Sequence, residues 1–202
     1  MKSKNYLCIN GKKTELTNEQ LKQLGIIKEP VATLSKDGKL AKIGDYEFIV
    51  LKNNGDTIEL LLKDTLENIK FDSGCNNFAK SEIREYLDDF ADKVEEIVGE
   101  ENIVEHKVDL TTLDGLKDYG SCKCRASLLT FMQARENIEL LDEFKISKWW
   151  WLATALSTPK HDIKYSVCCV SPIGCIYYYG FSNGDVGVRP FCILKSNIFV
   201  SE

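Results

Sequence analysis

The clearest pattern in the sequence is a pair of apolar-rich segments on either side of a polar turn. Residues 46–51 (YEFIVL) and 57–62 (TIELLL) are rich in β-branched, aromatic and leucine side chains, and NNGD at 53–56 separates them. Asn-Gly is a strong turn signal because both residues tolerate positive φ. The pattern therefore predicts a β-hairpin.

Farther along, apolar residues recur at spacings of three and four, the period of an amphipathic helix. Ser81 stands where an N-cap belongs, and Gly99 where a helix commonly ends. We therefore expect a helix that Ser81 caps and that ends at Gly99. Its apolar stripe consists of Ile83, Tyr86, Leu87, Phe90, Val94, Ile97 and Val98.

A second helix is expected after a loop and a short strand. Residues 110–120 have the composition of a loop, and residues 127–129 that of a short strand. Thr130 and Gln133 form a capping box, which predicts a helix that runs to about Leu141.

Short strands fill the C-terminal part of the chain. The pattern predicts strands at 165–170, 175–179 and 187–194, with a turn at 171–174, as a meander of antiparallel strands. Helices gathered in the middle of an antiparallel sheet protein indicate an α+β fold.

The first 28 residues form a separate pattern. They contain a short strand at 6–10 and a capping box of Thr17 and Gln20 for a helix that ends before Gly25. Six lysines and two glutamates give this segment a net charge of +4. A β-turn-helix unit of this size cannot bury its own apolar face, so we expect it to dock on the body or on a partner.

Composition narrows the class of protein. With 202 residues, 44% hydrophobic and 28% charged, the chain has the make-up of one globular domain with a small appendage. Its net charge of −5 disfavours a protein that coats nucleic acid. The apolar stretch after Lys4 is too short for a signal peptide, and the run at 149–156 is far short of the roughly 20 residues that span a bilayer. We expect a cytoplasmic protein, in a host cell cytosol, with no membrane segment and no direct binding of nucleic acid.

Eight cysteines make up about 4% of the chain, below the roughly 8–10% of a disulfide scaffold. We therefore expect reduced thiols. Structural zinc sites usually pair their ligands as CxxC, whereas this chain has a CxC at 122–124 and adjacent cysteines at 168 and 169. We expect no metal and no cofactor.

Charge is segregated on the first predicted helix. From Glu82 to Glu105 there are ten acidic residues against Arg84 and Lys93, a net charge of −8. One interpretation is the solvated face of a surface helix. The alternative is an anionic decoy that imitates the phosphates of a nucleic acid and occupies a basic groove on a host nuclease. The candidate residues of that surface are Glu82, Glu85, Asp89, Asp92 and Glu96.

Four segments in order carry a family resemblance: 42–51 (KIGDYEFIVL), 127–130 (SLLT), 149–154 (WWWLAT) and 187–194 (GVRPFCIL). Together they resemble a domain of unknown function that is widespread in clostridial bacteria and their phages and carries WWLRSP-like and GVRP-like motifs. The resemblance implies a C-type-lectin-like fold over residues 40–202, with an antiparallel sheet and two main helices, similar to formylglycine-generating enzymes. Residues 1–28 would then be a small N-terminal strand-helix appendage.

Departures from that family limit what the resemblance implies. Ala153, Thr154 and Ala155 stand where the family motif has arginine, serine and proline. The Glu-Pro-Asn and Trp-Asn-Asp calcium motifs of lectins are missing, so calcium-dependent sugar binding is not expected. The catalytic cysteines of formylglycine-generating enzymes cannot be mapped onto this chain. The resemblance therefore implies a fold without an activity.

Aromatic residues and one arginine supply the other candidate binding residues. Three consecutive tryptophans in an extended segment alternate between faces, so Trp150 and Trp151 either fill the core or present at least one ring outward. Tyr177 and Tyr179 allow the same two interpretations. Arg189 either ties loop carbonyls together or binds a ligand anion through its planar fork.

No spacing places a nucleophile beside a base. His106 and His161 stand out no more than the cysteines, and the chain has no GxSxG, HExxH, GxGxxG or P-loop motif. We therefore expect a non-enzymatic binding protein of a clostridial phage or mobile element that acts through protein–protein contacts, with loops 157–164 and 180–186 on display.

Two alternatives remain. One is a phage-encoded inhibitor of a host defence nuclease, of the anti-CRISPR kind, that uses the acidic helix as a nucleic-acid mimic. The other is a virion or surface ligand-binding protein. Neither the partner nor the oligomeric state follows from the sequence.

Overall fold

The computed structural model describes residues 6–9, 12–16, 20 and 30–201, and the chain divides into two compact units over residues 1–30 and 31–202. In the smaller unit, β1 (Tyr6–Ile9) and β2 (Lys12–Glu15) form an antiparallel hairpin. β1 confirms the strand expected at 6–10. β2 was not expected, because its residues lack an apolar alternation. The helix expected between Thr17 and Gly25 lies, apart from Gln20, outside the described residues.

The larger unit is built on an eight-stranded sheet with the order β10-β14-β6-β5-β4-β3-β15, in which β7 also pairs with β14. Every pairing is antiparallel except that of β3 with β15. The expected hairpin is confirmed as β5 and β6, and Gly55 takes a φ of +86° in its turn. The strands are β3 (Ala32–Leu34), β4 (Leu40–Ile43), β5 (Tyr46–Asn53), β6 (Thr57–Leu62), β7 (Ile103–Val104), β10 (Ala126–Ser127), β14 (Phe191–Lys195) and β15 (Phe199–Ser201).

Two smaller antiparallel sheets complete the strands. β8 (His106–Asp109) pairs with β9 (Ser121–Cys124), and β11 (Trp150–Ala155), β12 (Ser166–Val170) and β13 (Ile176–Gly180) form a three-stranded sheet. The turn expected at 171–174 is confirmed: the Gly174 N–H donates to the Ser171 carbonyl at 2.9 Å.

The predicted meander is wrong in its last strand, 187–194. The segment at 187–194 does not extend the three-stranded sheet, because its strand β14 lies between β10 and β6 in the large sheet. There Phe191, Cys192 and Leu194 are buried. Pairing with strands so far away in the chain leaves no local trace in the sequence.

The helix α2 (Glu82–Val98) follows the expected apolar stripe and ends at Gly99. Ser81 occupies the N-cap position as expected, but its side chain does not cap the helix. The Ser81 hydroxyl donates to the Phe78 carbonyl at 2.9 Å, and the N-cap contact comes from Asp72, whose Oδ2 accepts the Glu82 N–H at 3.0 Å.

The second expected helix is divided in two. The capping box of Thr130 and Gln133 is confirmed, but α3 (Phe131–Glu136) stops before Asn137, whose ψ of 20° is not helical, and α4 (Ile138–Glu143) starts after it. The described part of the chain also contains four 3₁₀ turns: η1 (Phe78–Lys80), η2 (Glu100–Asn102), η3 (Pro159–His161) and η4 (Ser196–Ile198).

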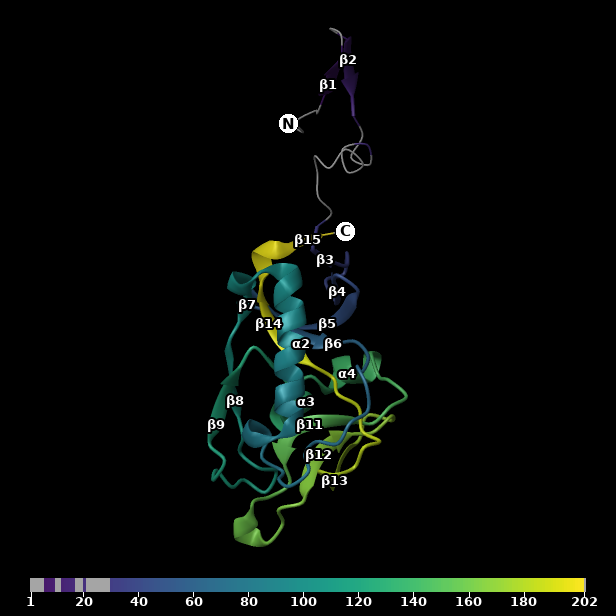
Figure 1. Ribbon diagram of the computed structural model, residues 1–202. Helices are drawn as coiled ribbons and strands as arrows, with labels where there is room; N and C mark the ends of the chain where they lie inside the picture. The colour runs from purple at the N-terminus through teal and green to yellow at the C-terminus, as the bar shows by residue number, and fades with distance from the viewer. Residues whose placement is uncertain (1–5, 10–11, 17–19, 21–29, 202) are drawn as a thin grey trace. The chain divides into compact units, whose positions relative to one another are not determined.

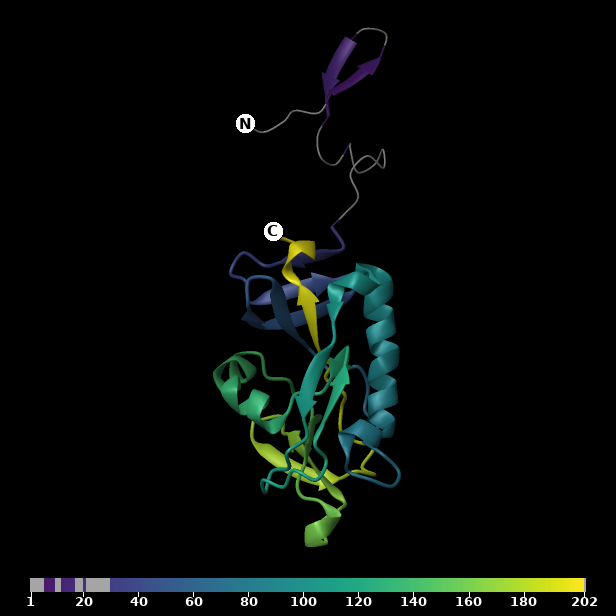
Figure 2. The same cartoon turned by 90° about the vertical axis from the view of Figure 1, so that its left-hand side faces the viewer.

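Within the larger unit, α2 runs along one side, with the eight-stranded sheet near its C-terminal end and the three-stranded sheet near its N-terminal end (Figures 1 and 2). Two apolar clusters form the core: the larger joins α2 to the sheets, and the smaller lies between β11, β14 and the α3–α4 region. The expected α+β class is confirmed.

Candidate functional site

The three-stranded sheet presents a group of aromatic side chains at its edge. Tyr177 and Tyr178 of β13 are 54% and 55% exposed. Trp149, just before β11, is half-buried and meets two tyrosine rings edge to face, with centroids 5.5 Å from Tyr177 and 5.0 Å from Tyr179. We call Trp149 and Tyr177–Tyr179 the aromatic edge. Edge-to-face packing holds the rings of Trp149, Tyr177 and Tyr179 in place on one face of the sheet, while strand alternation puts the exposed Tyr178 ring on the other face.

β13 is an edge strand, since in the described chain it pairs only with β12. The Ser171 N–H donates to the Cys175 carbonyl, and the Phe181 N–H to the Tyr165 carbonyl, both at 2.8 Å. Bonds to a neighbouring antiparallel strand alternate along the chain, so the odd-numbered residues of β13 face β12. The N–H and C=O of Tyr178 therefore face outward, available to another strand.

Trp150 and Trp151, two of the candidate binding residues, are buried. Trp151 belongs to the larger core cluster and donates its Nε1–H to the Ile69 carbonyl at 2.9 Å, while Trp150 belongs to the smaller cluster. Both faces of β11 are covered by these clusters, so neither ring is placed for a surface contact. The expectation that one of the three tryptophans faces outward applies only to the half-buried Trp149.

Arg189 has the carbonyl contacts of the first alternative. Its Nε donates to the Leu62 carbonyl at 2.8 Å, and its Nη2 donates to the carbonyls of Lys63 at 2.8 Å and Phe144 at 3.4 Å. Its Cζ lies 5.0 Å from the centre of the Trp150 ring. The arginine thus ties the end of β6 to the end of α4 from inside the protein.

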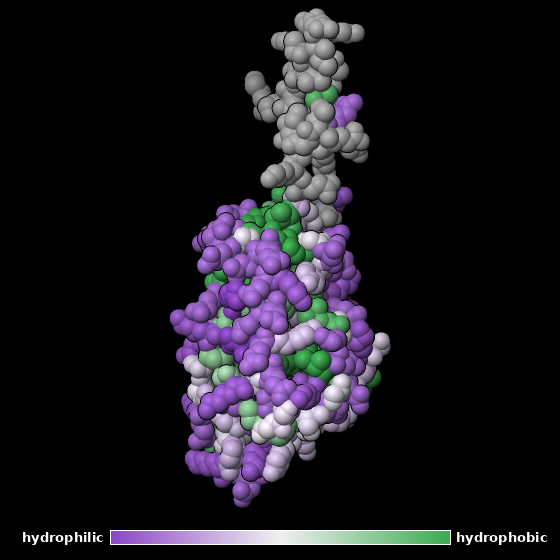
Figure 3. Space-filling view, in the orientation of Figure 1, coloured by the Kyte–Doolittle hydropathy of each residue, from purple (hydrophilic) through white to green (hydrophobic). Residues whose placement is uncertain are grey.

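The candidate acidic residues of α2 are all exposed. Glu82, Glu85, Asp89, Asp92 and Glu96 lie at spacings of three and four on one face of the helix, and Figure 3 shows hydrophilic side chains over the face along which α2 runs. The stripe is about 21 Å long at 1.5 Å per residue.

Basic residues from elsewhere offset part of this charge. Lys70 pairs with Glu82 at 2.8 Å, and Arg125 pairs with Asp92 at 2.6 Å and also with Glu95. Within the described chain, Glu85, Asp89 and Glu96 are the members of the stripe that form no ion pair. The exposed face of α2 is therefore negatively charged, but its net charge is smaller than the composition of the helix indicates.

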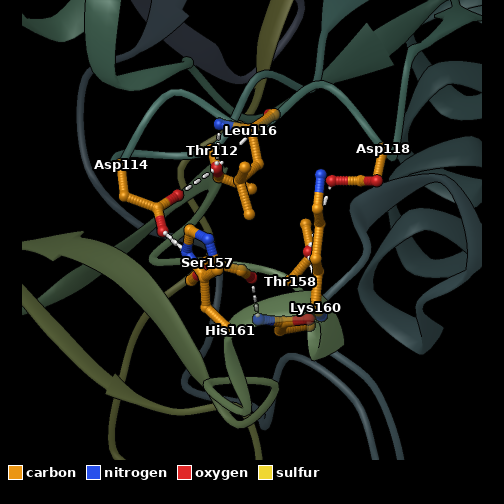
Figure 4. A network of polar contacts seen from close by, with 9 residues as sticks. Thr112, Asp114, Leu116, Asp118, Ser157, Thr158, Lys160 and His161 are labelled. Carbon is orange, nitrogen blue, oxygen red and sulfur yellow. Dashed lines mark hydrogen bonds and ion pairs between the residues drawn. The ribbon is translucent and has the colours of Figure 1, made fainter.

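A polar network joins two loops beside β11. Asp114 turns one carboxylate oxygen toward Thr112 and the other toward Ser157 and His161 (Figure 4). Thr112 donates to its Oδ1 at 2.5 Å, Ser157 donates to its Oδ2 at 2.6 Å, and His161 Nδ1 lies 2.9 Å from the same oxygen. The hydroxyls of Ser157 and Thr112, helped by His161, hold the pKa of the Asp114 carboxyl well below its usual range.

This network resembles an acid–base constellation only in its residue types. Ser157 is buried and donates to the carboxylate, not to the imidazole of His161, so it is not placed as a nucleophile activated by that base. The geometry instead fastens the loop at 157–164 to the loop at 110–120. One of the two loops expected to display variable residues is thus anchored at its base.

The thiols offer one unusual pair. Cys122 and Cys124 lie on the same strand, with the Arg84 Nη1 3.9 Å from the Cys122 Sγ. Contact with the Cys124 thiol, together with the Arg84 cation, lowers the pKa of Cys122, and that same contact raises the pKa of Cys124. The seven cysteines with described side chains are unbridged.

Two further findings concern only the described residues. No group of three or more His, Cys, Asp or Glu side chains in that part of the chain has the geometry to hold a metal ion. None of the helices described there has the length and apolar character needed to cross a bilayer.

In comparisons with known proteins, one family model matches part of the chain. Residues 113–196 match the model of a family described as a domain of unknown function (DUF6273). This segment contains α3, α4 and β11–β14, and with them the WWWLAT and GVRP motifs. No curated protein and no solved structure gives a significant match.

Trp149 and Tyr178 belong to the two aromatic runs in which exposed rings were expected, but they were not among the candidate residues chosen from them. Period-two alternation places Trp149 on the same face as Trp151, and Tyr177 on the same face as Tyr179. This alternation does not separate exposed rings from buried ones, since Trp151 is buried. It also could not show that β13 is an edge strand, because that depends on which strands pair.

Proposed function

We propose that this protein is a non-enzymatic binding protein that holds another protein against the aromatic edge. The observation that carries the proposal is the combination, on one edge strand, of exposed tyrosine rings and an outward-facing backbone. An extended segment of a partner can add to such an edge by main-chain hydrogen bonds while the rings contact its side chains. Tyrosine and tryptophan are also enriched at protein interfaces.

The scaffold and source that we propose rest on the motif resemblance. The C-type-lectin-like fold over residues 40–202 and the origin in a clostridial phage or mobile element are both implications of it, and the DUF6273 match over residues 113–196 supports the relation to a domain family. The proposed origin indicates where to look for the partner, namely in the cytoplasm of a clostridial host.

The test is capture of partners from a clostridial lysate with three forms of the tagged protein. Tyr178→Pro removes the outward-facing N–H without removing a bond to β12, and edge strands tolerate proline. Tyr178→Ala is the matched control, since it loses the ring but keeps the N–H. We expect a partner that the unmodified protein retains in high salt, that Tyr178→Ala weakens and that Tyr178→Pro loses.

A partner that Tyr178→Pro retains as well as Tyr178→Ala does would refute strand addition. Capture of no partner by the unmodified protein would count against the whole proposal.

The acidic face of α2 supports a second candidate, the nuclease inhibitor that imitates nucleic acid. The favourable observation is the exposed row of Glu85, Asp89 and Glu96, free of ion pairs in the described chain. Reversal of these three residues to lysine should abolish inhibition while the fold survives, because none of them anchors a neighbouring basic residue. A partner that washes off in salt and is lost on this reversal, but not with Tyr178→Pro, would replace the first candidate by the second.

A further inference from the structure

A cavity of about 170 Å³ lies between α4 and the turn that joins β12 to β13. Its volume is similar to that of an engineered cavity of about 150 Å³ that binds benzene. Most of the wall is apolar and consists of Ile138, Leu141, Ile146, Trp150, Val170 and Ile173.

Arg189 also lines this cavity and is 0% exposed. Three of its hydrogen bonds go to backbone carbonyls and use Nε and Nη2 (above). Nη1 is buried and has no partner in the described chain. A buried donor without a partner is uncommon, because it gives up its hydrogen bonds to water without replacement.

Within the described chain the charge of Arg189 is met by the Trp150 ring and by carbonyl oxygens, and not by an ion pair. No described carboxylate forms an ion pair with it, and Asp64, a carboxylate near enough to influence it, is paired with Lys148 at 3.0 Å. Burial lowers the pKa of Arg189 to about 10, so the guanidinium keeps its charge at neutral pH. A buried cation of this kind is stabilised by an anion that reaches it.

The rim of the cavity adds little net charge. Asp142 and Lys145 stand there and pair with each other at 3.2 Å. Ile173, 73% exposed, extends the apolar wall outward. The site therefore combines an apolar wall with one buried cation in its lining, which suits a ligand with an apolar body and a single negative group.

We propose that this cavity binds a small carboxylate with a compact apolar body, aromatic or branched, whose oxygen accepts the free N–H of Arg189 Nη1. The apolar body lies against Trp150, Leu141 and Val170. The same chemistry has two sources: a free carboxylic acid, or the C-terminal residue of a peptide. The proposal is independent of the aromatic edge, since it uses a different surface and a different class of ligand.

Titration with sodium benzoate, followed by the fluorescence of the tryptophans and by calorimetry, tests the site. Benzyl alcohol is the neutral control of similar size. A charge-assisted hydrogen bond predicts that benzoate binds about tenfold more tightly than benzyl alcohol. Equal affinities, or no binding of benzoate below about 10 mM, would overturn the proposal.

Two short peptides that end in phenylalanine, one with a free and one with an amidated C-terminus, separate the sources. Binding of benzoate alone indicates a free acid. Tighter binding of the free-carboxylate peptide than of benzoate indicates a peptide C-terminus. Equal binding of the two peptides would contradict recognition of a carboxylate.

Variants locate the ligand without depending on the anchoring role of Arg189. Ile173→Glu places a negative charge at the rim and should weaken benzoate about fivefold, while the matched Ile173→Gln changes it by less than about twofold. Benzoate should also slow alkylation of Cys175, which is exposed and lines the cavity, but not of Cys75. If neither effect is seen while benzoate binds, the ligand lies elsewhere and the assignment to this cavity is wrong.

Discussion

Because Asp72 caps α2, replacing it should destabilise the protein by an amount that can be estimated from its hydrogen bonds. One oxygen of this carboxylate accepts the N–H groups of Gly74 and Cys75, both at 2.6 Å, and the other accepts the Glu82 N–H at 3.0 Å. Asp72→Ala leaves all three donors without this acceptor. Loss of a helix cap costs about 0.5–2 kcal/mol, and each hydrogen bond to a charged group contributes about 1.5–3 kcal/mol. Because water can reach some of the freed groups, we expect Asp72→Ala to lower the free energy of unfolding by about 2–4 kcal/mol.

Two comparisons sharpen this prediction. Asp72→Asn keeps one oxygen for Gly74 and Cys75 but turns its NH₂ toward the Glu82 N–H, and should cost about 1–2 kcal/mol. Ser81→Ala removes only the hydroxyl bond to the Phe78 carbonyl, for about 1 kcal/mol.

The destabilisation caused by replacing Asp72 should depend on pH. Burial raises the pKa of the Asp72 carboxyl, but the three backbone donors together outweigh it, and the folded-state pKa lies below the ordinary 3.8. A carboxyl with a lowered folded-state pKa contributes stability that is present above the unfolded-state pKa and lost as the pH falls through the folded-state value. The difference between Asp72→Asn and the unmodified protein should therefore shrink in acid.

Urea unfolding followed by tryptophan fluorescence, at neutral pH and near pH 3, measures these costs. The reasoning fails if Asp72→Ala is no more destabilising than Ser81→Ala at neutral pH. It also fails if the cost of Asp72→Asn is the same at both pH values.

Two further predictions concern other parts of the larger unit. Gly187→Ala should destabilise the protein by about 1–3 kcal/mol in thermal unfolding, because a Cβ there would lie 2.5 Å from the Thr65 Cγ2 and 3.1 Å from the Trp149 carbonyl oxygen. Adding Thr65→Ser should recover part of the lost stability. An unchanged melting temperature in Gly187→Ala would contradict the contact. In a carboxyl NMR titration, Asp114 should have its midpoint clearly below 3.8 and Ser157→Ala should raise it; an ordinary midpoint would mean that the hydroxyl contacts do not persist in solution.

Local features of this fold were readable from the sequence. The apolar stripe of α2 repeats within one helical turn, and the capping box of Thr130 and Gln133 closes over four residues. The hairpin of β5 and β6 needs only the turn chemistry around Gly55 and the flanking apolar segments. Each of these depends on interactions between residues close together in the chain, so composition and spacing are enough to indicate them.

Candidate sites were predicted less well, because exposure depends on what packs against a residue. Trp150 and Tyr177 have similar aromatic surroundings in the sequence, yet the first is buried between core clusters and the second is exposed at a sheet edge. Asn137 interrupts a helix whose cap was correctly predicted. The acidic residues of α2 were placed correctly on one exposed face, but their partial neutralisation by Arg125 requires a contact across 33 positions.

By itself the sequence determined the α+β class, the long helix with its charged face, and the absence of a recognisable catalytic motif. Tertiary structure alone decided that Asp72 caps α2, that β14 lies in the large sheet, and that Arg189 holds three carbonyls while one of its nitrogens stays free. The physical reason is that these contacts join residues that are distant in the chain. Their energy comes from burial and hydrogen bonding in one particular packing arrangement, which no local pattern of apolar and polar residues specifies.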